Sequence, residues 1–406
     1  MPALSYWSLG FAPLERIRHR RLLSRPDVHT VRVPMFPDRT GGPSFSLSYA
    51  DADAGGAGPV LVVLPGGPGL ASVVPYLRAR RRLTAAGFRV LMPEHRGVGL
   101  SRLDDDGRPL PVEAMRSRYA VADVLRVLDA AGVSTALLLG TSYGGYLALR
   151  AALSAPERWQ GLILDSWAED ADVRDYQRWL FWRGERADTA PIAELVRDLA
   201  GRGVVTDEEL CSIVPMAFEM TGALATLNLL RKVDAGKTTT WRQLARLAAT
   251  ESTGGRRPFI FDGDPALAIF LREIERIEPD GQPFDRALQF TSLRRRFGEL
   301  PWEPDNLDGS VSLPTVLLHG ARDARTPDRA MQALAERLPE AALIEFPQAG
   351  HDLLRMRGGA VTTIAAALAR DGLPGALAAG ERLRHHRPRR RLLELYERRL
   401  SRRAAS

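Results

Sequence analysis

Ser142 lies at the centre of the pentapeptide Gly-Thr-Ser-Tyr-Gly, between an apolar run at residues 136–139 and a helical pattern at residues 146–153. A strand, a Gly-x-Ser-x-Gly turn and a helix in this order are typical of a nucleophile elbow, which exposes a reactive serine hydroxyl at the edge of a sheet. The start of the following helix favours negative charge at that point. The alternative is a tight turn with a buried serine, but the elements on both sides favour a nucleophile.

A serine hydroxyl becomes a good nucleophile only when a base accepts its proton and an acidic group orients that base. His351 follows an apolar strand pattern at residues 342–346, and Asp323 follows another at residues 314–320. The chain order serine, acid, histidine is the one that accompanies a nucleophile elbow. Because the carboxyl ends of parallel strands meet at one edge of a sheet, we expect both side chains to lie near Ser142.

Each partner of the serine has an alternative reading. Asp323 has the position of a helix N-cap before Thr-Pro, and His351 has that of a surface-loop histidine. Asp165, at the end of the strand pattern 161–164, is a rival acid. We prefer Asp323 because its loop has the Gly-x-x-Asp spacing, and we interpret His319, at the end of a strand, as structural.

The tetrahedral intermediate of acyl transfer needs two N–H donors aimed at its oxyanion. One donor comes from the residue after the nucleophile, Tyr143, and the other from a loop after an earlier strand. The apolar run 60–64 is followed by Pro-Gly-Gly-Pro-Gly at residues 65–69, where glycine allows an N–H to turn outward without a Cβ clash. The alternative is a plain Gly/Pro turn, but its place upstream of the serine favours an oxyanion loop.

These motifs together resemble a known family. Residues 64–69 are similar to the His-Gly-Gly-Pro-Gly segment of proline iminopeptidases and the Gly-Gly-Pro-Gly of tripeptidyl aminopeptidases, and residues 94–101 resemble their Asp-x-Arg-Gly-x-Gly-x-Ser loop. Residues 142–146 and 323–327 resemble the tripeptidyl type. The resemblance implies an α/β-hydrolase with the catalytic triad Ser142, His351 and Asp323, and with Gly67 and Tyr143 in the oxyanion hole.

The resemblance covers the expected core and hardly touches the region between residues 168 and 307. It departs from the family pattern at Pro65, which replaces a histidine, and at Glu94 and His95, which replace the usual Asp-Gln. None of these three positions belongs to the triad. We interpret Arg96 as a structural salt-bridging residue.

The arrangement of the elements predicts an α/β-hydrolase fold, with a mostly parallel central sheet flanked by helices and an inserted helical cap. Residues 28–36 and 44–49 alternate like antiparallel strands, and the strand signal disappears after residue 167. The predicted parts are a basic N-terminal lead at 1–27, a core at 28–167 and 308–375, a helical cap at 168–307 and an Arg-rich helical tail at 376–406.

Composition indicates an ordinary globular protein: of 406 residues, 45% are hydrophobic and 26% charged. We see no secretory signal and no apolar run long enough to span a membrane. Cys211 is the only cysteine, so we expect no intrachain disulfide and a cytoplasmic location. No cysteine and histidine cluster has the spacing of a metal site, and we predict no metal and no other cofactor.

The basic charge is concentrated in the tail. Residues 381–406 contain ten arginines and three glutamates, an excess of +7 that equals the net charge of the whole chain. Apolar residues at helical spacing in 389–400 suggest a helix that docks on the body, pairs with another subunit or touches an acidic surface, the alternative being a solvated helix. We do not predict nucleic-acid binding, because the basic stretches lie at the ends and lack interleaved aromatic residues.

The cap is expected to shape the substrate pocket. An aminopeptidase needs a carboxylate for the substrate's α-ammonium group, and Glu219 is the best candidate, with Glu209 and Glu273 weaker; the alternative for each is an exposed helix charge. Aromatic residues of the cap could line the pocket or fill the cap's own core: Trp179, Trp182, Phe218 and Phe270.

The expected function is that of an aminopeptidase of the proline iminopeptidase type, which removes N-terminal residues from short peptides. An alternative is a hydrolase of an ester, lactone or amide of a small metabolite, because the core motifs specify acyl transfer and not the leaving group. A further alternative is a non-catalytic ligand receptor with the same fold. Partners other than a small substrate are limited to a second copy of the chain, through the tail.

Overall fold

The computed structural model describes residues 11–386, apart from 54, 57, 170–171, 253–255, 276–277, 291–300 and 305–308. Its centre is an eight-stranded sheet with the strand order β1-β2-β4-β3-β5-β6-β9-β10. Strand β2 is antiparallel to both neighbours and the remaining pairs are parallel. The strands are β1 Val28–Pro34, β2 Ser44–Ala52, β3 Val60–Leu64, β4 Arg89–Pro93, β5 Ala136–Thr141, β6 Trp159–Asp165, β9 Thr315–Gly320 and β10 Ala341–Phe346.

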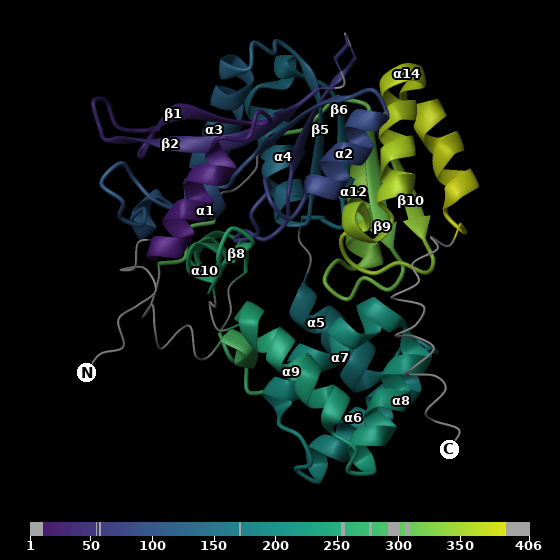
Figure 1. Ribbon diagram of the computed structural model, residues 1–406. Helices are drawn as coiled ribbons and strands as arrows, with labels where there is room; N and C mark the ends of the chain where they lie inside the picture. The colour runs from purple at the N-terminus through teal and green to yellow at the C-terminus, as the bar shows by residue number, and fades with distance from the viewer. Residues whose placement is uncertain are drawn as a thin grey trace.

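The predicted fold class, a mostly parallel sheet flanked by helices, is confirmed (Figure 1). Strands β3 and β5 read as continuous apolar runs because helices cover both faces of the sheet. Successive side chains point to opposite faces, so Leu61 joins one hydrophobic cluster and Val62 the other. Helices α3 Ser117–Ala130, α4 Tyr143–Ser154 and α12 Asp328–Arg337 contribute to one cluster, and α2 Leu77–Ala85 and α14 Gly358–Leu383 to the other.

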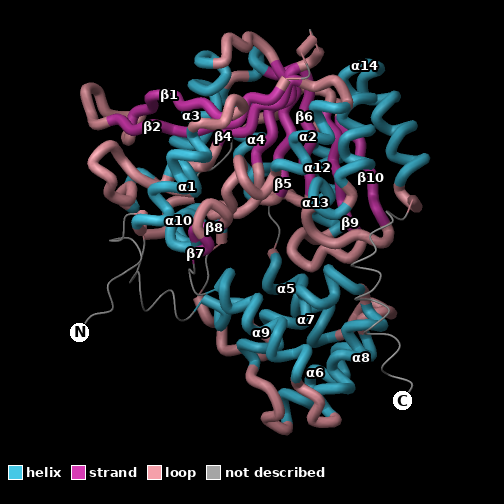
Figure 2. Tube along the Cα trace, in the orientation of Figure 1, coloured by secondary structure: helices cyan, strands magenta, loops and turns pink. Residues whose placement is uncertain are grey.

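The region between β6 and β9 forms a cap with its own hydrophobic core. The helices are α5 Val173–Arg178, η5 Trp179–Arg183, α6 Ala190–Gly201, α7 Asp207–Thr221, α8 Ala223–Asp234, α9 Thr239–Ser252, α10 Gly263–Ile269, η6 Phe270–Ile274 and η7 Arg286–Phe290. Helices α5 to α9 lie together beyond one end of the strands, whereas α10 lies beside α1 Pro13–Leu23 with the hairpin that precedes it (Figure 1), and Figure 2 shows that the region is almost entirely helical.

The sequence predicted an all-helical cap, but this region also contains two short strands. Strands β7 Arg256–Arg257 and β8 Phe261–Asp262 form a small antiparallel hairpin. Two residues per strand are too few to produce an alternating pattern, so the signal was absent from the sequence. The hairpin is held instead by tertiary contacts, since Phe261 bridges to Leu70 in the loop after β3.

The two ends of the chain also differ from the predicted parts. Part of the basic lead forms helix α1 Pro13–Leu23, whose Glu15 pairs with Arg256 of the hairpin at 3.0 Å. Helix α14 continues past residue 375, where the sequence placed the end of the core, with a kink at Gly372. Ala376 and Ala379 are buried in the core cluster, so this stretch packs with the core. The predicted helix at 389–400 lies outside the described residues.

Short helical turns complete the core: η2 Gly99–Ser101, η3 Val112–Ala114, η4 Pro156–Arg158 and α13 Leu353–Met356. Among the helices of the described residues, none combines the length and apolar character needed to cross a membrane.

Candidate active site

Ser142 lies in a strained turn between β5 and α4, with φ 54° and ψ −121°. Such a backbone conformation is unusual for a non-glycine residue and is found where the surrounding structure enforces it. Here the small neighbours are a steric requirement: a Cβ on Gly140 would lie 2.1 Å from the Gly144 carbonyl oxygen, and a Cβ on Gly144 would lie 2.0 Å from the Leu64 carbonyl oxygen. The Ser142 N–H donates to the Asp165 carbonyl at 2.8 Å. The turn therefore has the geometry of a nucleophile elbow.

Asp323 and His351 follow neighbouring strands β9 and β10, and the structure brings them together. His351 Nδ1 lies 2.9 Å from Asp323 Oδ2, and because a carboxylate only accepts, Nδ1 carries the proton. The other carboxylate oxygen accepts the N–H groups of Arg325 and Thr326, at 2.8 and 3.0 Å. Asp323 is therefore held from both sides, which leaves Nε2 of the imidazole as the proton acceptor. It is not the N-cap of α12, which is Pro327.

The charges of this pair stabilise each other. Burial alone would raise the pKa of Asp323, but the charge and hydrogen bond of His351 outweigh it, so the pKa lies below its ordinary value. Burial alone would lower the pKa of His351, but Asp323 outweighs it and raises that pKa. The site thus favours an imidazolium once His351 has accepted a proton.

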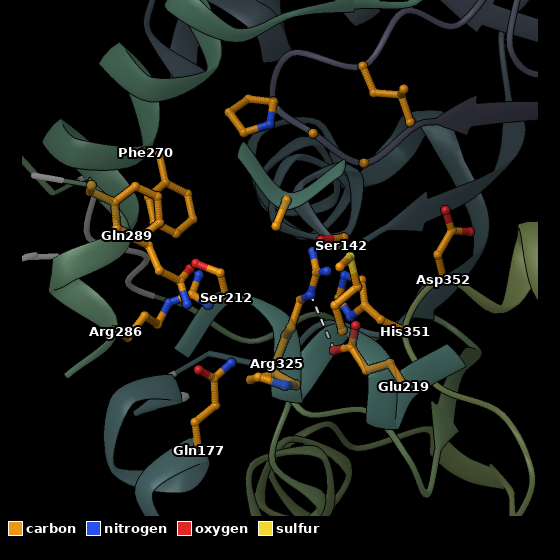
Figure 3. A pocket seen from close by; sticks show the side chains of 18 of the residues that line it. Ser142, Gln177, Ser212, Glu219, Phe270, Arg286, Gln289, Arg325, His351 and Asp352 are labelled. Carbon is orange, nitrogen blue, oxygen red and sulfur yellow. Dashed lines mark hydrogen bonds and ion pairs between the residues drawn. The ribbon is translucent and has the colours of Figure 1, made fainter. Parts of the chain in front are cut away.

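Ser142 and His351 line the same cavity, of about 320 Å³ between the sheet edge and the cap (Figure 3). Gly66 and Gly67 contribute to its wall from the core, and Glu219 and Phe270 from the cap. Serine, histidine and acid thus converge at one edge of the sheet, although Ser142 and His351 lie 209 positions apart in the sequence. The cavity is of the size of a small-molecule site.

The loop after β3 lies directly against Ser142, since a Cβ on Gly66 would lie 3.3 Å from the serine Cβ. Gly67 has φ 138°, and a Cβ there would lie 2.5 Å from the Gly69 nitrogen, so only glycine fits. Tyr143 is the first residue of α4, where the N–H has no partner within the helix. The two predicted oxyanion donors therefore belong to segments that flank the serine.

His95, one of the departures from the family pattern, supports this loop. Its Nε2 lies 3.1 Å from the Pro65 carbonyl, and its ring stands edge-on to Tyr143 with centroids 5.2 Å apart. Burial lowers the pKa of His95 to about 4, so the ring is neutral. Because the carbonyl only accepts, Nε2 carries the proton. His95 thus links the two segments that carry the predicted donors.

Asp165, the rival acid, has a different set of partners. Its carboxylate accepts from the Thr141 and Ser166 hydroxyls at 3.0 and 2.8 Å, and from the N–H groups of Leu353 and Leu354 at 3.0 and 2.9 Å. It therefore joins the ends of β5 and β6 to the helix that follows His351.

The other polar candidates of the core are structural. His319 is buried, and its Nε2 lies 3.1 Å from the Thr326 carbonyl. Arg96 is also buried and forms two hydrogen bonds to Asp123, at 2.8 and 2.7 Å.

Of the predicted cap residues, Glu219 lies in the cavity wall, where its Oε1 accepts from Arg325 Nε at 3.2 Å. The expectation that Trp179 and Trp182 line the pocket is wrong: both pack against the cap's hydrophobic core, which also buries Phe218. Their helical spacing directs them to that core because the cap must bury an apolar face of its own. Phe270, in contrast, lines the cavity.

The two weaker glutamate candidates lie elsewhere. Glu209 forms a capping box with Thr206 at the start of α7. Glu273 is buried and accepts the Ser117 N–H at 2.9 Å. Neither lines the cavity around Ser142.

Three arginines that were not among the predicted site residues also line this cavity. They are Arg286, Arg325 and Arg355. The only signal for Arg325 was its place two residues after Asp323, and the other two carry no motif. In the part of the chain that the structure describes, no group of three or more His, Cys, Asp or Glu side chains is arranged to hold a metal ion.

The parallel sheet, the serine elbow and the histidine–acid pair together define an α/β hydrolase. Residues 59–354 match the family model of the α/β hydrolase fold, and the chain belongs to this family. It is similar to the polyketide synthase ThaQ of Burkholderia thailandensis, with 39% identity over 154 residues, which cover 38% of this chain and 6% of that protein. It is also similar to the 2-hydroxy-6-oxo-6-phenylhexa-2,4-dienoate hydrolase of Burkholderia cepacia, with 34% identity over 121 residues, 30% of this chain and 40% of that enzyme.

These alignments span less than half the length of either curated relative. Among solved structures, the proline iminopeptidase of Mycobacterium smegmatis is similar, with 20% identity, a TM-score of 0.45 and coverage of 86% of this chain and all of that one.

Proposed function

We propose that the protein is a serine hydrolase that works through an acyl-enzyme. Ser142 Oγ attacks a substrate carbonyl while His351 Nε2 accepts its proton, and Asp323 holds the imidazole in the tautomer that this step needs. The N–H groups of Gly67 and Tyr143 stabilise the oxyanion. His351 then protonates the leaving group, and a water molecule, deprotonated by His351, releases the acyl group. The observation that carries the proposal is the 2.9 Å hydrogen bond of Asp323 to a histidine that shares a cavity with the strained serine.

Covalent labelling tests this proposal directly. A fluorophosphonate probe is expected to form an adduct that is located on Ser142 by peptide mass spectrometry and is lost in Ser142→Ala. Ser212→Ala is the matched control, because Ser212 is a second serine in the wall of the same cavity and should leave labelling unchanged. Absence of an adduct on the folded natural protein would favour the non-catalytic receptor instead.

Two substrate classes draw support from different observations. Glu219 in the cavity wall supports the aminopeptidase, because a carboxylate near the serine is what an N-terminal ammonium needs. However, that carboxylate is already bonded to Arg325 at 3.2 Å, which compensates its charge. The geometry therefore supports best a hydrolase of a small ester or amide.

A substrate panel separates the two classes. Aminocoumarin amides of proline, alanine and Ala-Ala-Pro are compared with p-nitrophenyl esters of short acids, using Ser142→Ala to subtract background. We expect turnover of the esters without turnover of any of the three amides, since an activated ester reacts faster than an amide on a peptidase as well. A preference for the amides with a free N-terminus that is lost on N-acetylation would instead support an aminopeptidase of the proline iminopeptidase type. Self-association through residues 376–406 and a cytoplasmic location stay predictions.

A further inference from the structure

We propose that Arg325 forms an anion subsite beside Ser142, so that the enzyme selects esters or amides whose acyl group carries a carboxylate. This inference rests on the proposed serine hydrolase function and names the class of its substrate. Three observations support it: the contact between Glu219 and Arg325, the charged residues of the cavity wall, and the aromatic residues that line the same cavity.

Glu219 holds Arg325 by one edge of its guanidinium. The carboxylate accepts from Arg325 Nε at 3.2 Å and from the Ala324 N–H, also at 3.2 Å. The Glu219 side chain is only 7% exposed, whereas that of Arg325 is 40% exposed. The Glu219 carboxylate is thus more deeply buried than the Arg325 guanidinium. Figure 3 shows the guanidinium extending from Glu219 toward Ser142.

This arrangement is suited to binding an anion. A buried carboxylate needs a cationic partner, so the pairing with Arg325 satisfies Glu219 and also fixes the arginine's orientation. A guanidinium is a planar fork that matches a carboxylate, and Arg325 would bind the substrate in addition to the partners it already has. A substrate carboxylate at this fork would lie near the attacking serine. The carboxylate must therefore be only a few bonds away from the scissile carbonyl of the same substrate.

The charged residues of the cavity wall also favour an anionic substrate over a cationic one. Arg286 and Arg355 also line it, and with Arg325 they outnumber the acidic lining residues, Glu219 and Asp352. The partner of Arg286, Glu275 at 3.2 Å, is not part of the wall. Asp352 lies 3.7 Å from Arg355, so each lining arginine has an acidic partner, but the wall itself presents more cationic than anionic groups to a ligand, which disfavours the free ammonium group of a peptide.

The apolar part of the substrate has a separate surface. Phe270 and Phe290 line the cavity and stack on each other, with ring centroids 5.7 Å apart and an angle of 25° between their planes. Aromatic side chains provide a large apolar contact area. The expected substrate therefore combines a carboxylate close to the scissile bond with an apolar portion, as in a half-ester of a dicarboxylic acid.

The test compares p-nitrophenyl hydrogen glutarate, which has a free carboxylate, with its neutral methyl ester. The natural protein should have the higher kcat/KM for the anionic ester. In Arg325→Met, kcat/KM for the anionic ester should fall about 10- to 100-fold further than that for the neutral ester, as expected for a lost charge-assisted hydrogen bond. Arg325→Lys should keep part of the preference. Arg329→Met is the control, because Arg329 is exposed on α12 outside the cavity and should change neither rate.

Glu219→Gln distinguishes the anion subsite from an ammonium site. If Arg325 binds the substrate, the variant should keep a preference for the anionic ester, because a negative charge has been removed. If Glu219 binds an ammonium group, the variant should instead lose turnover of free N-terminal amides. The proposal is overturned if the natural protein prefers the neutral ester, or if Arg325→Met slows both esters equally while Ser142 is still labelled. Failure of labelling would instead overturn the serine hydrolase itself.

Discussion

Gly350 packs so closely on Glu219 that a Cβ at position 350 would lie 2.6 Å from the Glu219 carbonyl oxygen and 2.9 Å from its Cα. Gly350 directly precedes His351, and the Glu219 side chain bonds the N–H of Ala324, which directly follows Asp323. One residue of cap helix α7 therefore touches the loops that carry both the proposed base and the proposed acid. The cap and these two loops form a single packed unit, which links the shape of the cap to the geometry of the site.

Gly350→Ala should displace His351 from the serine. A methyl group in this space forces the loop or α7 to shift, which costs about 1–3 kcal/mol in a well-packed region. We expect the rate of fluorophosphonate labelling at Ser142 to fall at least about tenfold, since a displacement of about 1 Å is enough to impair positioning. Gly359→Ala is the control, because a Cβ on Gly359 would meet no atom within 4 Å apart from those of its own stretch of helix. Equal labelling rates in the two variants would contradict the close contact.

Asp323→Asn and Asp165→Asn should have different effects. Asp323→Asn removes the charge beside His351 and should lower kcat for a p-nitrophenyl ester about 1,000- to 10,000-fold with little loss of stability. Asp165→Asn removes an acceptor shared by four donors and should lower the free energy of unfolding by about 1–3 kcal/mol. Urea unfolding and kcat are measured for both variants. The assignment of the acid is wrong if Asp165→Asn has the larger effect on kcat while remaining fully stable.

The pH dependence should report the histidine. Nε2 accepts a proton only when the ring is neutral, so kcat/KM should fall as the pH drops through the pKa of His351, which Asp323 raises above its ordinary value of about 6.5. Arg325 opposes and Glu219 favours protonation of this ring. Removal of a negative charge lowers the pKa, so Asp323→Asn should move the acid limb to lower pH. Profiles from about pH 5 to about pH 9 measure this, and an unchanged limb argues against His351 as the base.

Asp262 should be required for the stability of the hairpin β7–β8 on the core. Its carboxylate is almost fully buried and bonds the Gly99 N–H and Arg102 at 2.8 Å each. Because Asp262→Asn breaks this buried ion pair, it should lower the free energy of unfolding by about 3–5 kcal/mol. The urea midpoint measures the change. Asp371→Asn, which removes an exposed pair with Arg370, is the control and should leave the midpoint in place.

The same variant should also slow the labelling of Ser142. The Asp262 N–H donates to the Gly69 carbonyl at 2.9 Å, and the Ala71 N–H donates to the Ile260 carbonyl at 2.9 Å. The hairpin thus holds the loop that carries Gly67. A destabilised variant that is labelled at the natural rate under native conditions would show that this loop keeps its conformation without the hairpin.

Much of the core could be predicted from the sequence because its signals are local. An apolar run identifies a buried strand whatever lies beside it, and the steric limits around Ser142 require glycine at positions 140 and 144. The rule that the carboxyl ends of parallel strands meet at one edge then places Asp323 and His351 near that serine. Each step needs only a few adjacent residues and a general rule of topology.

The cap could not be predicted in the same way, because a helical pattern shows that a face is buried but not against what. The helical spacing of Trp179 and Trp182 fits either a pocket wall or the cap's own core, and both pack against that core. The pairing of Glu219 with Arg325 joins residues 106 positions apart, on a cap helix and a core loop. The ion-pair partner of a charged residue on a cap helix is fixed only when the cap packs on the core. The sequence by itself therefore determined the candidate reactive groups and the edge of the sheet where they lie, and the tertiary structure alone decided which charges surround them.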